Sequence, residues 1–293
     1  MPTRNGVRPD AIRFPTSREA RVLILPDLSK AGAEELARRL EGFLEDRAEV
    51  VGVESARESA PIALKPDLVI VLGGDGALLA TSHRLGARQV PVMGLNFGNV
   101  GFLAAVAPTR AREVLDEVFD GKGVREDHAL MHTKVVRGEK TLIDTHILNE
   151  VVLMRAWTSP LCEVDLTVDR RPVCSYRGDG VIVATATGST AYSLAAGGPL
   201  LSPRLDAWVV TPIAPYMLGM RPLVLPGQRV AILTVRSQLG FSADGREECD
   251  LLPGDVVRVG PSRRRFQLVV DPKANFFARL RAKLRWGEAP GPG

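Results

Sequence analysis

The sequence has few cysteines and no motif that would give them a chemical role. In 293 residues there are three, Cys162, Cys174 and Cys249, whose spacing fits neither a zinc knuckle nor a CxxC redox motif. No stretch reaches the roughly 18 apolar residues of a membrane span, and the amino-terminal segment lacks the apolar core of a signal peptide. We therefore expect a cytoplasmic protein with no membrane partner. Its ends, residues 1 to about 19 and 287–293, are expected to be frayed.

A strong excess of charge is also missing. The 38 Lys and Arg residues exceed the 34 Asp and Glu residues by only four, and apart from Arg263–Arg265 the basic residues are scattered. A nucleic-acid partner is therefore not expected. The length and a 45% hydrophobic content are enough for about two domains with their own cores.

Several common site motifs are absent as well. The nucleotide-binding fingerprints GxxxxGK[ST] and GxGxxG do not occur, and neither does the GxSxG elbow of serine hydrolases. His128 and His132 stand four apart, but they lie in strand-like sequence, where that spacing separates two residues by roughly 13 Å. We therefore predict no protein-bound zinc and no dedicated metal-ligand set.

Residues 1–123 alternate between strand-like and helix-like patterns. Buried strands are expected at 21–26, 67–72 and 90–95, and helices at 31–46, 77–85 and 108–119. This alternation predicts an α/β domain whose parallel sheet is covered on both faces.

Residues 124–273 have a different pattern, with short strand-like runs such as TLIDTHILNEVVLM (141–154) and DGVIVATA (179–186). They predict a β-rich, sandwich-like, mostly antiparallel domain. The pattern returns to helix at 276–286, where Phe276, Leu280 and Leu284 share one face. We expect residues 274–293 to pack back onto the first domain.

The sharpest local signal is VIVLGGDGALLA, in which a buried strand ends in Gly73, Gly74, Asp75 and Gly76 and a helical pattern follows at once. Ligands bind at this edge of open α/β sheets, and glycines let a phosphate approach the backbone. Asp75 would then take a proton from an attacking hydroxyl or help to hold a metal. The alternative is a tight turn in which Asp75 only caps the helix.

A second glycine-rich run, GLNFGNVGFLA (94–104), follows the next strand and should lie on the same edge of the sheet. Asn96 and Asn99 are polar groups in an apolar frame there. The alternative is a turn that uses Asn and Gly for left-handed backbone. Two such loops on one edge favour a crevice.

The second half also holds polar groups in apolar sequence. Asn149 and Glu150 interrupt a strongly apolar strand, and a buried Glu150 would need a partner or a ligand. Arg177 and Asp179 precede another strand; they could pair with each other or both reach one ligand. After that strand comes TGSTAYSLAAGGP (187–199), a run too polar and too small-residued for a core strand.

Four motifs, GGDG, NFGNVGFLA, LNEVVL and DGVIVATATGSTAYSLAAGGP, together resemble those of the NAD kinases in order and spacing. GGDG is shared with lipid kinases of the diacylglycerol and sphingosine type, whereas the last motif is long and specific. The resemblance implies a Rossmann-like, phosphofructokinase-like parallel-sheet domain followed by a β-rich domain that binds NAD.

The activity that the resemblance implies is phosphoryl transfer from ATP or polyphosphate, with Mg²⁺, to the adenosine ribose 2′-hydroxyl of NAD, giving NADP. The open alternatives are a lipid kinase and a non-catalytic dinucleotide-binding protein. The sequence leaves open whether the donor is ATP or polyphosphate and whether the acceptor is NAD or NADH. Relatives lead us to expect a homodimer or homotetramer.

By the same resemblance Asp75 is the general base. The implied nucleotide-binding positions are Gly73, Gly74, Gly76, Asn96, Phe97, Asn149, Glu150, Arg177, Asp179, Thr187, Ser189, Thr190, Ala191, Tyr192, Ser193, Leu194 and Ala195.

The chain departs from the family pattern at three places. Ala77 stands where the glycine-aspartate motif usually continues with Thr, and Ala186 stands in a position that is commonly proline. In SADGREE, which matches a late family segment, Arg246 replaces an amide found in some members. Asp244 and Arg246 are therefore not included among the predicted site residues.

Overall fold

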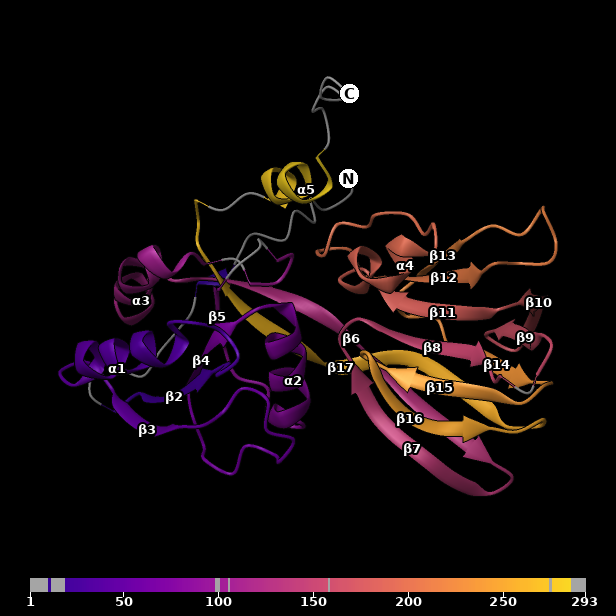
Figure 1. Ribbon diagram of the computed structural model, residues 1–293, viewed down its shortest axis with the longest axis horizontal. Coiled ribbons are helices and arrows are strands. Elements are labelled where there is room, and N and C mark those ends of the chain that lie inside the picture. Colours follow the sequence, from indigo (N-terminus) through magenta and orange to yellow (C-terminus); the bar gives the residue numbers. More distant parts are fainter. Residues whose placement is uncertain are drawn as a thin grey trace, which may run out of the picture. The chain divides into compact units, whose positions relative to one another are not determined.

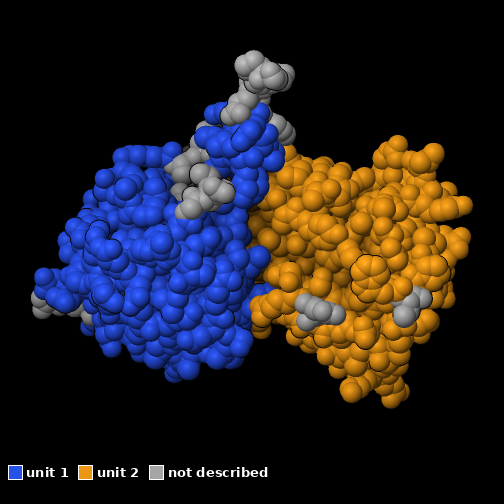
Figure 2. Space-filling view, in the orientation of Figure 1, with its two compact units in different colours: residues 1–127, 266–293 blue, residues 128–265 orange. Residues whose placement is uncertain are grey.

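The computed structural model describes residues 10–11, 19–97, 101–104, 106–157, 159–273 and 276–285. The chain divides into two compact units (Figure 2). The first contains the residues up to Asp127 together with those from Phe266 onward, and the second contains His128–Arg265. Among the described residues, no helix combines the length and apolarity needed to cross a membrane. The frayed ends that the sequence predicts fall largely outside these residues.

The sheet of the first unit is parallel. Its strands β2 (Arg21–Pro26), β3 (Glu49–Val53), β4 (Leu68–Gly73) and β5 (Val92–Asn96) lie in the order β5-β4-β2-β3. The last residues of the long strand β17 (Val256–Val270) pair with β5, also in parallel. β4 is buried along its whole length, as a strand covered on both faces must be.

Helices cover both faces of this sheet (Figure 1). α1 (Ala33–Leu44) and α3 (Ala111–Phe119), the latter preceded by a 3₁₀ turn at Pro108–Arg110, share a core with one face. α2 (Asp75–Leu85) packs Leu78 against Gly94 on the other face, where a Cβ on Gly94 would lie 2.8 Å from the leucine. The predicted α/β class is confirmed, and the ends of the predicted elements differ from the observed ones by at most three residues, whereas β3 was not predicted.

The carboxy-terminal helix α5 (Phe276–Leu284) is grouped with the first unit, and Leu280 on it is buried. β1 (Asp10–Ala11) pairs with the start of β6 (Val124–Arg137).

Two antiparallel sheets make up the second unit. One has the order β13-β12-β11-β8-β15-β16, and the other contains β10-β9-β14 with the first residues of β17, and also β6 paired to β7. The remaining bounds are β7 Lys140–Ile147, β8 Glu150–Arg155, β9 Cys162–Val168, β10 Arg171–Gly178, β11 Gly180–Thr185, β12 Ala207–Ile213, β13 Leu223–Pro226, β14 Ala231–Val235, β15 Leu239–Ala243 and β16 Arg246–Leu251.

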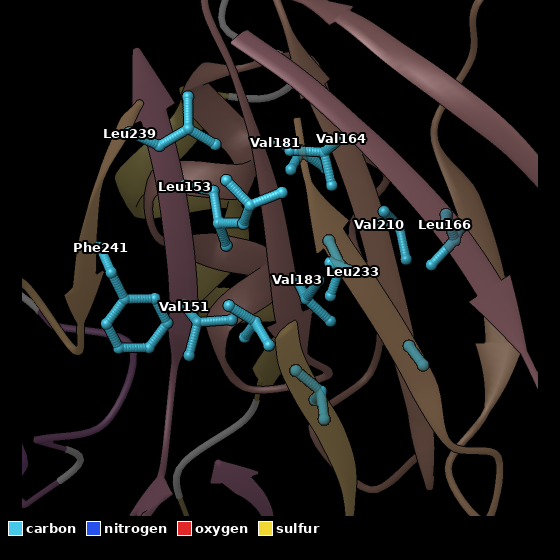
Figure 3. Packing of buried hydrophobic residues seen from close by; sticks show 14 of the residues in the cluster. Val151, Leu153, Val164, Leu166, Val181, Val183, Val210, Leu233, Leu239 and Phe241 are labelled. Atoms are coloured by element: carbon cyan, nitrogen blue, oxygen red, sulfur yellow. The ribbon is translucent and has the colours of Figure 1, made fainter. Parts of the chain in front are cut away.

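The core of this unit lies between the two sheets. Val151 and Val181 from one sheet and Leu166 and Leu233 from the other belong to a single buried cluster (Figure 3). Side chains alternate between the two faces of a strand, so each sheet contributes every second residue to this layer. The predicted β-rich sandwich is confirmed.

One predicted strand is wrong. The run 141–154 is not continuous, because β7 ends at Ile147 and β8 begins at Glu150, with a bend at Leu148 and Asn149. Asn149 therefore lies in the bend rather than inside a strand. The physical reason is a side chain from a distant turn, described below.

Candidate active site

The glycine-rich loop follows β4 without any intervening residue. Gly74 is the N-cap of α2, and no side-chain hydrogen bond caps this helix end. Gly73 is required by packing, because its Cβ would lie 2.8 Å from the Cβ of Ala77. At Gly74 and Gly76 an added Cβ would meet nothing within 4 Å. These two glycines therefore leave open space beside the backbone, which is the arrangement that admits a phosphate.

Asp75 does not cap its own helix. Its carboxylate accepts three backbone N–H groups from the second glycine-rich run: Phe102 donates to Oδ2 at 2.8 Å, and Leu103 and Ala104 donate to Oδ1 at 3.0 Å each. A carboxylate has about four lone-pair sites. One acceptor site, on Oδ2, therefore remains for a ligand.

The two glycine-rich runs meet at the carboxyl edge of the sheet, as the sequence predicts. Gly73 and Asn96, the last residues of β4 and β5, are paired in register. Gly101 has no side chain because a Cβ there would overlap the Asp75 carboxylate. Asn96 has a buried Oδ1 with no hydrogen-bond partner among the described residues, and Phe97 packs at the rim of the core. Asn99 lies outside the described residues.

An ion pair between a buried aspartate and an exposed arginine supports this edge. Asp27, which follows β2, is 1% exposed and accepts two hydrogen bonds from the Arg57 guanidinium, at 2.9 and 3.0 Å. The Arg57 hydrogen bonds are the main reason that the pKa of Asp27 falls to about 2, although burial opposes them. The charge of Asp27 beside Gly73 is therefore neutralised by an exposed arginine.

In the second unit, Asp244 repeats the bonding pattern of Asp75. It accepts the N–H of Leu148 on Oδ2 at 2.9 Å, and those of Asn149 and Glu150 on Oδ1 at 2.7 and 3.2 Å. Asp244 has a φ of 47° and is followed by Gly245 at 76°, in the tight turn between β15 and β16. This carboxylate is what bends the chain at Leu148 and Asn149 and ends β7.

Glu150 is buried, with 6% of its surface exposed. Burial, reinforced by the nearby charge of Asp244, raises its pKa to about 8, although the backbone N–H of Tyr192 donates to it and partly opposes the shift. Its Oε2 has no hydrogen-bond partner among the described residues. A buried carboxyl that is largely neutral at pH 7 can donate a hydrogen bond as well as accept one.

The 187–199 run packs directly against Asn149. The Thr185 N–H donates to the Asn149 carbonyl at 2.8 Å, and the Thr185 hydroxyl donates to the Leu148 carbonyl at 2.6 Å. At Gly188 a Cβ would overlap the Asn149 carbonyl, so only glycine fits. Two motifs far apart in the sequence are thus brought into contact.

Most hydroxyls of the run serve the fold rather than an open pocket. Ser189 Oγ donates to the Ala186 carbonyl at 2.7 Å, Ser193 bonds to the Thr211 hydroxyl at 2.9 Å, and both serines are fully buried. Thr187 is hydrogen bonded to Nδ1 of buried His128 at 2.9 Å. These bonds hold the 3₁₀ turn Gly188–Thr190 and the short helix α4 (Tyr192–Ala195) in place. Thr190, Ala191, Tyr192, Leu194 and Ala195 keep some exposure.

Arg177 and Asp179 do not pair with each other, which was one of the two alternatives that the sequence left open. Arg177 Nε donates to Glu163 on the neighbouring strand at 2.8 Å, and Asp179 instead accepts from Arg155 Nε at 2.8 Å. In the antiparallel pair Arg177 lies opposite Glu163, so strand register rather than sequence proximity selects the partner.

Asp179 and Tyr192 line an open cavity of about 300 Å³, together with Met154, Arg155, Trp157 and Ile213. The sequence identified two of these six residues. The signal for the others was weak: RAWT (155–158) follows an apolar strand, but nothing local places its side chains beside Tyr192. Asp244 was considered in the sequence and left out of the predicted site, although an Asp-Gly pair between two strand-like runs is a tight-turn signal.

A parallel sheet with an open glycine loop, joined in one chain to a β sandwich with a second polar site, defines a two-domain nucleotide-binding protein. The model of the ATP-NAD kinase N-terminal domain matches residues 8–123, and that of the ATP-NAD kinase C-terminal domain matches residues 148–270. The chain belongs to the NAD kinase family.

Curated relatives match most of the chain and share one name. An NAD kinase from Pseudomonas paraeruginosa is 38% identical over 231 residues, which are 78% of each chain. An NAD kinase from Pseudomonas putida is 35% identical over 284 residues, covering 92% of this chain and 96% of the relative. The protein is thus an NAD kinase, a phosphotransferase, and a lipid kinase or a non-catalytic binder is not favoured.

Solved structures agree. A yeast NADH kinase complexed with NADH superimposes with a TM-score of 0.81 at 24% identity, covering 93% of this chain and 89% of that one, and shows the shared fold. An NAD kinase from Archaeoglobus fulgidus in complex with ATP has a TM-score of 0.72 at 27% identity, covering 90% of this chain and 98% of that one.

Proposed function

We propose that the protein transfers the terminal phosphoryl group of ATP to the 2′-hydroxyl of the adenosine ribose of NAD, giving NADP and ADP. The observation that carries this proposal is the position of Asp75, whose carboxylate keeps one acceptor site beside the open glycines 74 and 76. ATP as donor is supported by the name of the matching family and by the related Archaeoglobus fulgidus enzyme, which was solved with ATP.

Asp75 acts on the attacking hydroxyl. A ribose hydroxyl that donates to Oδ2 has its oxygen lone pairs free to attack phosphorus. As the new O–P bond forms, the bond to the bridging oxygen of the donor breaks and the carboxylate accepts the proton. Phosphoryl transfer depends mostly on positioning and charge neutralisation, so one oriented carboxylate is a sufficient base.

The donor phosphates approach the backbone at Gly74 and Gly76, where space is open, and Gly73 stays a proposed position of the same loop. Mg²⁺ bound to a nucleotide takes most of its ligands from phosphate and water, and needs one or two oxygens from the protein. The unpartnered Oδ1 of Asn96 fits such a ligand. Among the described residues there is no group of three acidic, His or Cys side chains that would hold an ion without the nucleotide. Bound in this way, Mg²⁺ would neutralise phosphate charge.

The acceptor binds to the second unit. Asn149 and Glu150 would contact its hydroxyls or base, since the Glu150 Oε2 has no partner among the described residues. Asp179 and Tyr192 offer further contacts through the cavity they line. The remaining predicted positions, Phe97, Arg177, Thr187, Ser189, Thr190, Ala191, Ser193, Leu194 and Ala195, stay proposed nucleotide-binding residues. For Ser189 and Ser193 the contribution would be to hold the turn.

A grid of donors and acceptors tests the proposal. Purified protein with Mg²⁺ is incubated with ATP or polyphosphate and with NAD or NADH, and NADP or NADPH is measured by a coupled dehydrogenase. We expect ATP and NAD to give the highest kcat/KM. No product above a no-enzyme control in any combination would refute the function, and a preference for polyphosphate or NADH would replace the donor or acceptor proposed here.

We further propose that the protein is a cytoplasmic homodimer or homotetramer. Self-association is supported by three exposed apolar side chains in the loop after β12 of the second unit, Tyr216, Met217 and Leu218. Sedimentation velocity at micromolar concentration tests this, and a single monomeric species would refute it.

A further inference from the structure

Two basic side chains of helix α5, Arg279 and Lys283, lie one turn apart in the first unit. The Lys283 ammonium lies over the Phe102 ring, 4.9 Å from its centre. Phe102 is the residue whose N–H donates to Asp75 Oδ2. The helix therefore lies against the segment that Asp75 holds.

Arg279, one turn before Lys283, has an unusual environment. Its Nε is buried and has no hydrogen-bond partner among the described residues. Burial lowers the pKa of its guanidinium, while the charges of Glu126 and Asp75 oppose the shift. Arg279 therefore lies one helical turn from Lys283, which contacts Phe102 in the loop that Asp75 holds.

A buried guanidinium N–H that lacks an acceptor is costly unless a ligand supplies one. A planar guanidinium is best matched by carboxylate or phosphate, which accept two parallel hydrogen bonds. The Asp75 carboxylate already accepts three backbone N–H groups. A ligand phosphate beside the open glycines is the acceptor that this arrangement lacks.

We propose that Arg279 binds the phosphate chain of the phosphoryl donor at the loop formed by Gly73–Gly76. This inference rests on the proposed function and adds to it a residue from the far end of the chain. Arg279 donates charge-assisted hydrogen bonds to the phosphate oxygens of the bound donor and neutralises part of their negative charge.

Arg281 on the same helix provides a matched control, because it is exposed and lies two residues further on. Arg279→Gln should raise the KM for ATP by about tenfold or more and leave the KM for NAD within about twofold, because a charge-assisted hydrogen bond to the donor alone is lost. Arg281→Gln should change neither. Arg279→Lys should recover part of the loss, since it restores charge without the planar fork.

Equal increases in the KM values for ATP and NAD, or equal effects of Arg279→Gln and Arg281→Gln, would overturn the proposal in favour of a structural role. Should Arg279→Gln fail to fold, the KM values of Arg279→Lys and hydrogen exchange of the wild type still test the proposal. In the wild type, ATP with Mg²⁺ should slow hydrogen exchange of the amides in residues 276–284. Unchanged exchange at saturating ATP would equally overturn it.

The two proposals can fail separately. A wild-type protein that makes no NADP would refute the proposed function. If ATP still protected α5 in that protein, and Arg279→Gln removed the protection, the phosphate contact would stand.

Discussion

Asp75 and Asp244 form the same structure in two different surroundings. Each accepts three consecutive backbone N–H groups, one on Oδ2 and two on Oδ1, and each thereby fixes a loop distant in sequence. Asp75 is partly exposed beside open glycines at the end of a parallel strand, whereas Asp244 is 7% exposed and lies next to the buried Glu150.

The difference shows that such a set of backbone bonds does not define a catalytic group. Three N–H donors orient a carboxylate equally well in both places. What separates the two aspartates is exposure: Asp75 is partly exposed and lies between two glycines at which an added Cβ would meet nothing within 4 Å, while Asp244 is buried and holds the backbone of Asn149 and Glu150. This difference supports the proposal that Asp75 acts on the substrate, whereas Asp244 positions the backbone of residues 148–150.

The largest effect is expected from Asp75→Asn. The amide removes the negative charge and sets an NH₂ group against backbone N–H donors. We expect kcat to fall by about 10²–10⁴-fold, the usual contribution of a positioned acid or base, while NAD binding measured by calorimetry changes far less. Equal losses in turnover and in NAD binding would argue against a role for Asp75 as the base.

Glu150→Gln tests how the buried carboxyl of Glu150 makes the stability of the protein depend on pH. Because the folded-state pKa of Glu150 is raised to about 8, its neutral form is favoured in the folded protein. Its contribution to stability is complete below its unfolded pKa and is lost as the pH rises through 8. The difference in free energy of unfolding, variant minus wild type, should therefore increase by about 2–4 kcal/mol from pH 5 to pH 9. Urea unfolding at both values measures it, and parallel pH profiles would contradict it.

Asp244→Asn tests the positioning role. Asn tolerates the left-handed backbone of this turn, so the substitution mainly disrupts the hydrogen bonds to residues 148–150. We expect a loss of about 1–3 kcal/mol in the free energy of unfolding. The KM for NAD should rise about tenfold with kcat within about threefold, the signature of lost ground-state binding. A fall in kcat as large as that of Asp75→Asn would erase the distinction between the two aspartates.

The smallest change in stability is expected at Gly74. With φ of −102° and no atom within 4 Å of an added Cβ, Gly74→Ala should shift the free energy of unfolding by less than about 1 kcal/mol. It should still raise the KM for ATP, because a methyl group would occupy the space of the donor phosphates. Gly73→Ala is the control: its Cβ meets Ala77, so it should destabilise by about 1–3 kcal/mol. An unchanged KM for ATP in Gly74→Ala would show that the donor phosphates do not bind beside this glycine.

Much of the first unit was predictable because its signals are local. A buried strand that ends in glycines before a helical pattern places GGDG at the carboxyl edge of the sheet, and the next strand brings Asn96 to the same edge. The partner of Arg177 was not predictable in this way. Asp179 is nearer in sequence, but antiparallel register puts Glu163 opposite Arg177.

The 187–199 run likewise contains contacts that the local sequence did not predict. Its hydroxyls look like ligand contacts in the sequence, yet Ser189 and Ser193 are fully buried and bonded within the protein. Composition indicates that hydroxyls are needed, but only packing decides which of them face inward.

The sequence by itself determined the two kinds of domain, the glycine loop and the family, because periodicity and contiguous motifs are properties of neighbouring residues. The tertiary structure decided which groups meet: Asp75 with the N–H groups of 102–104, and Asp244 with those of 148–150. These contacts join residues far apart in the chain, and they arise from strand order and helix packing, which no local pattern encodes.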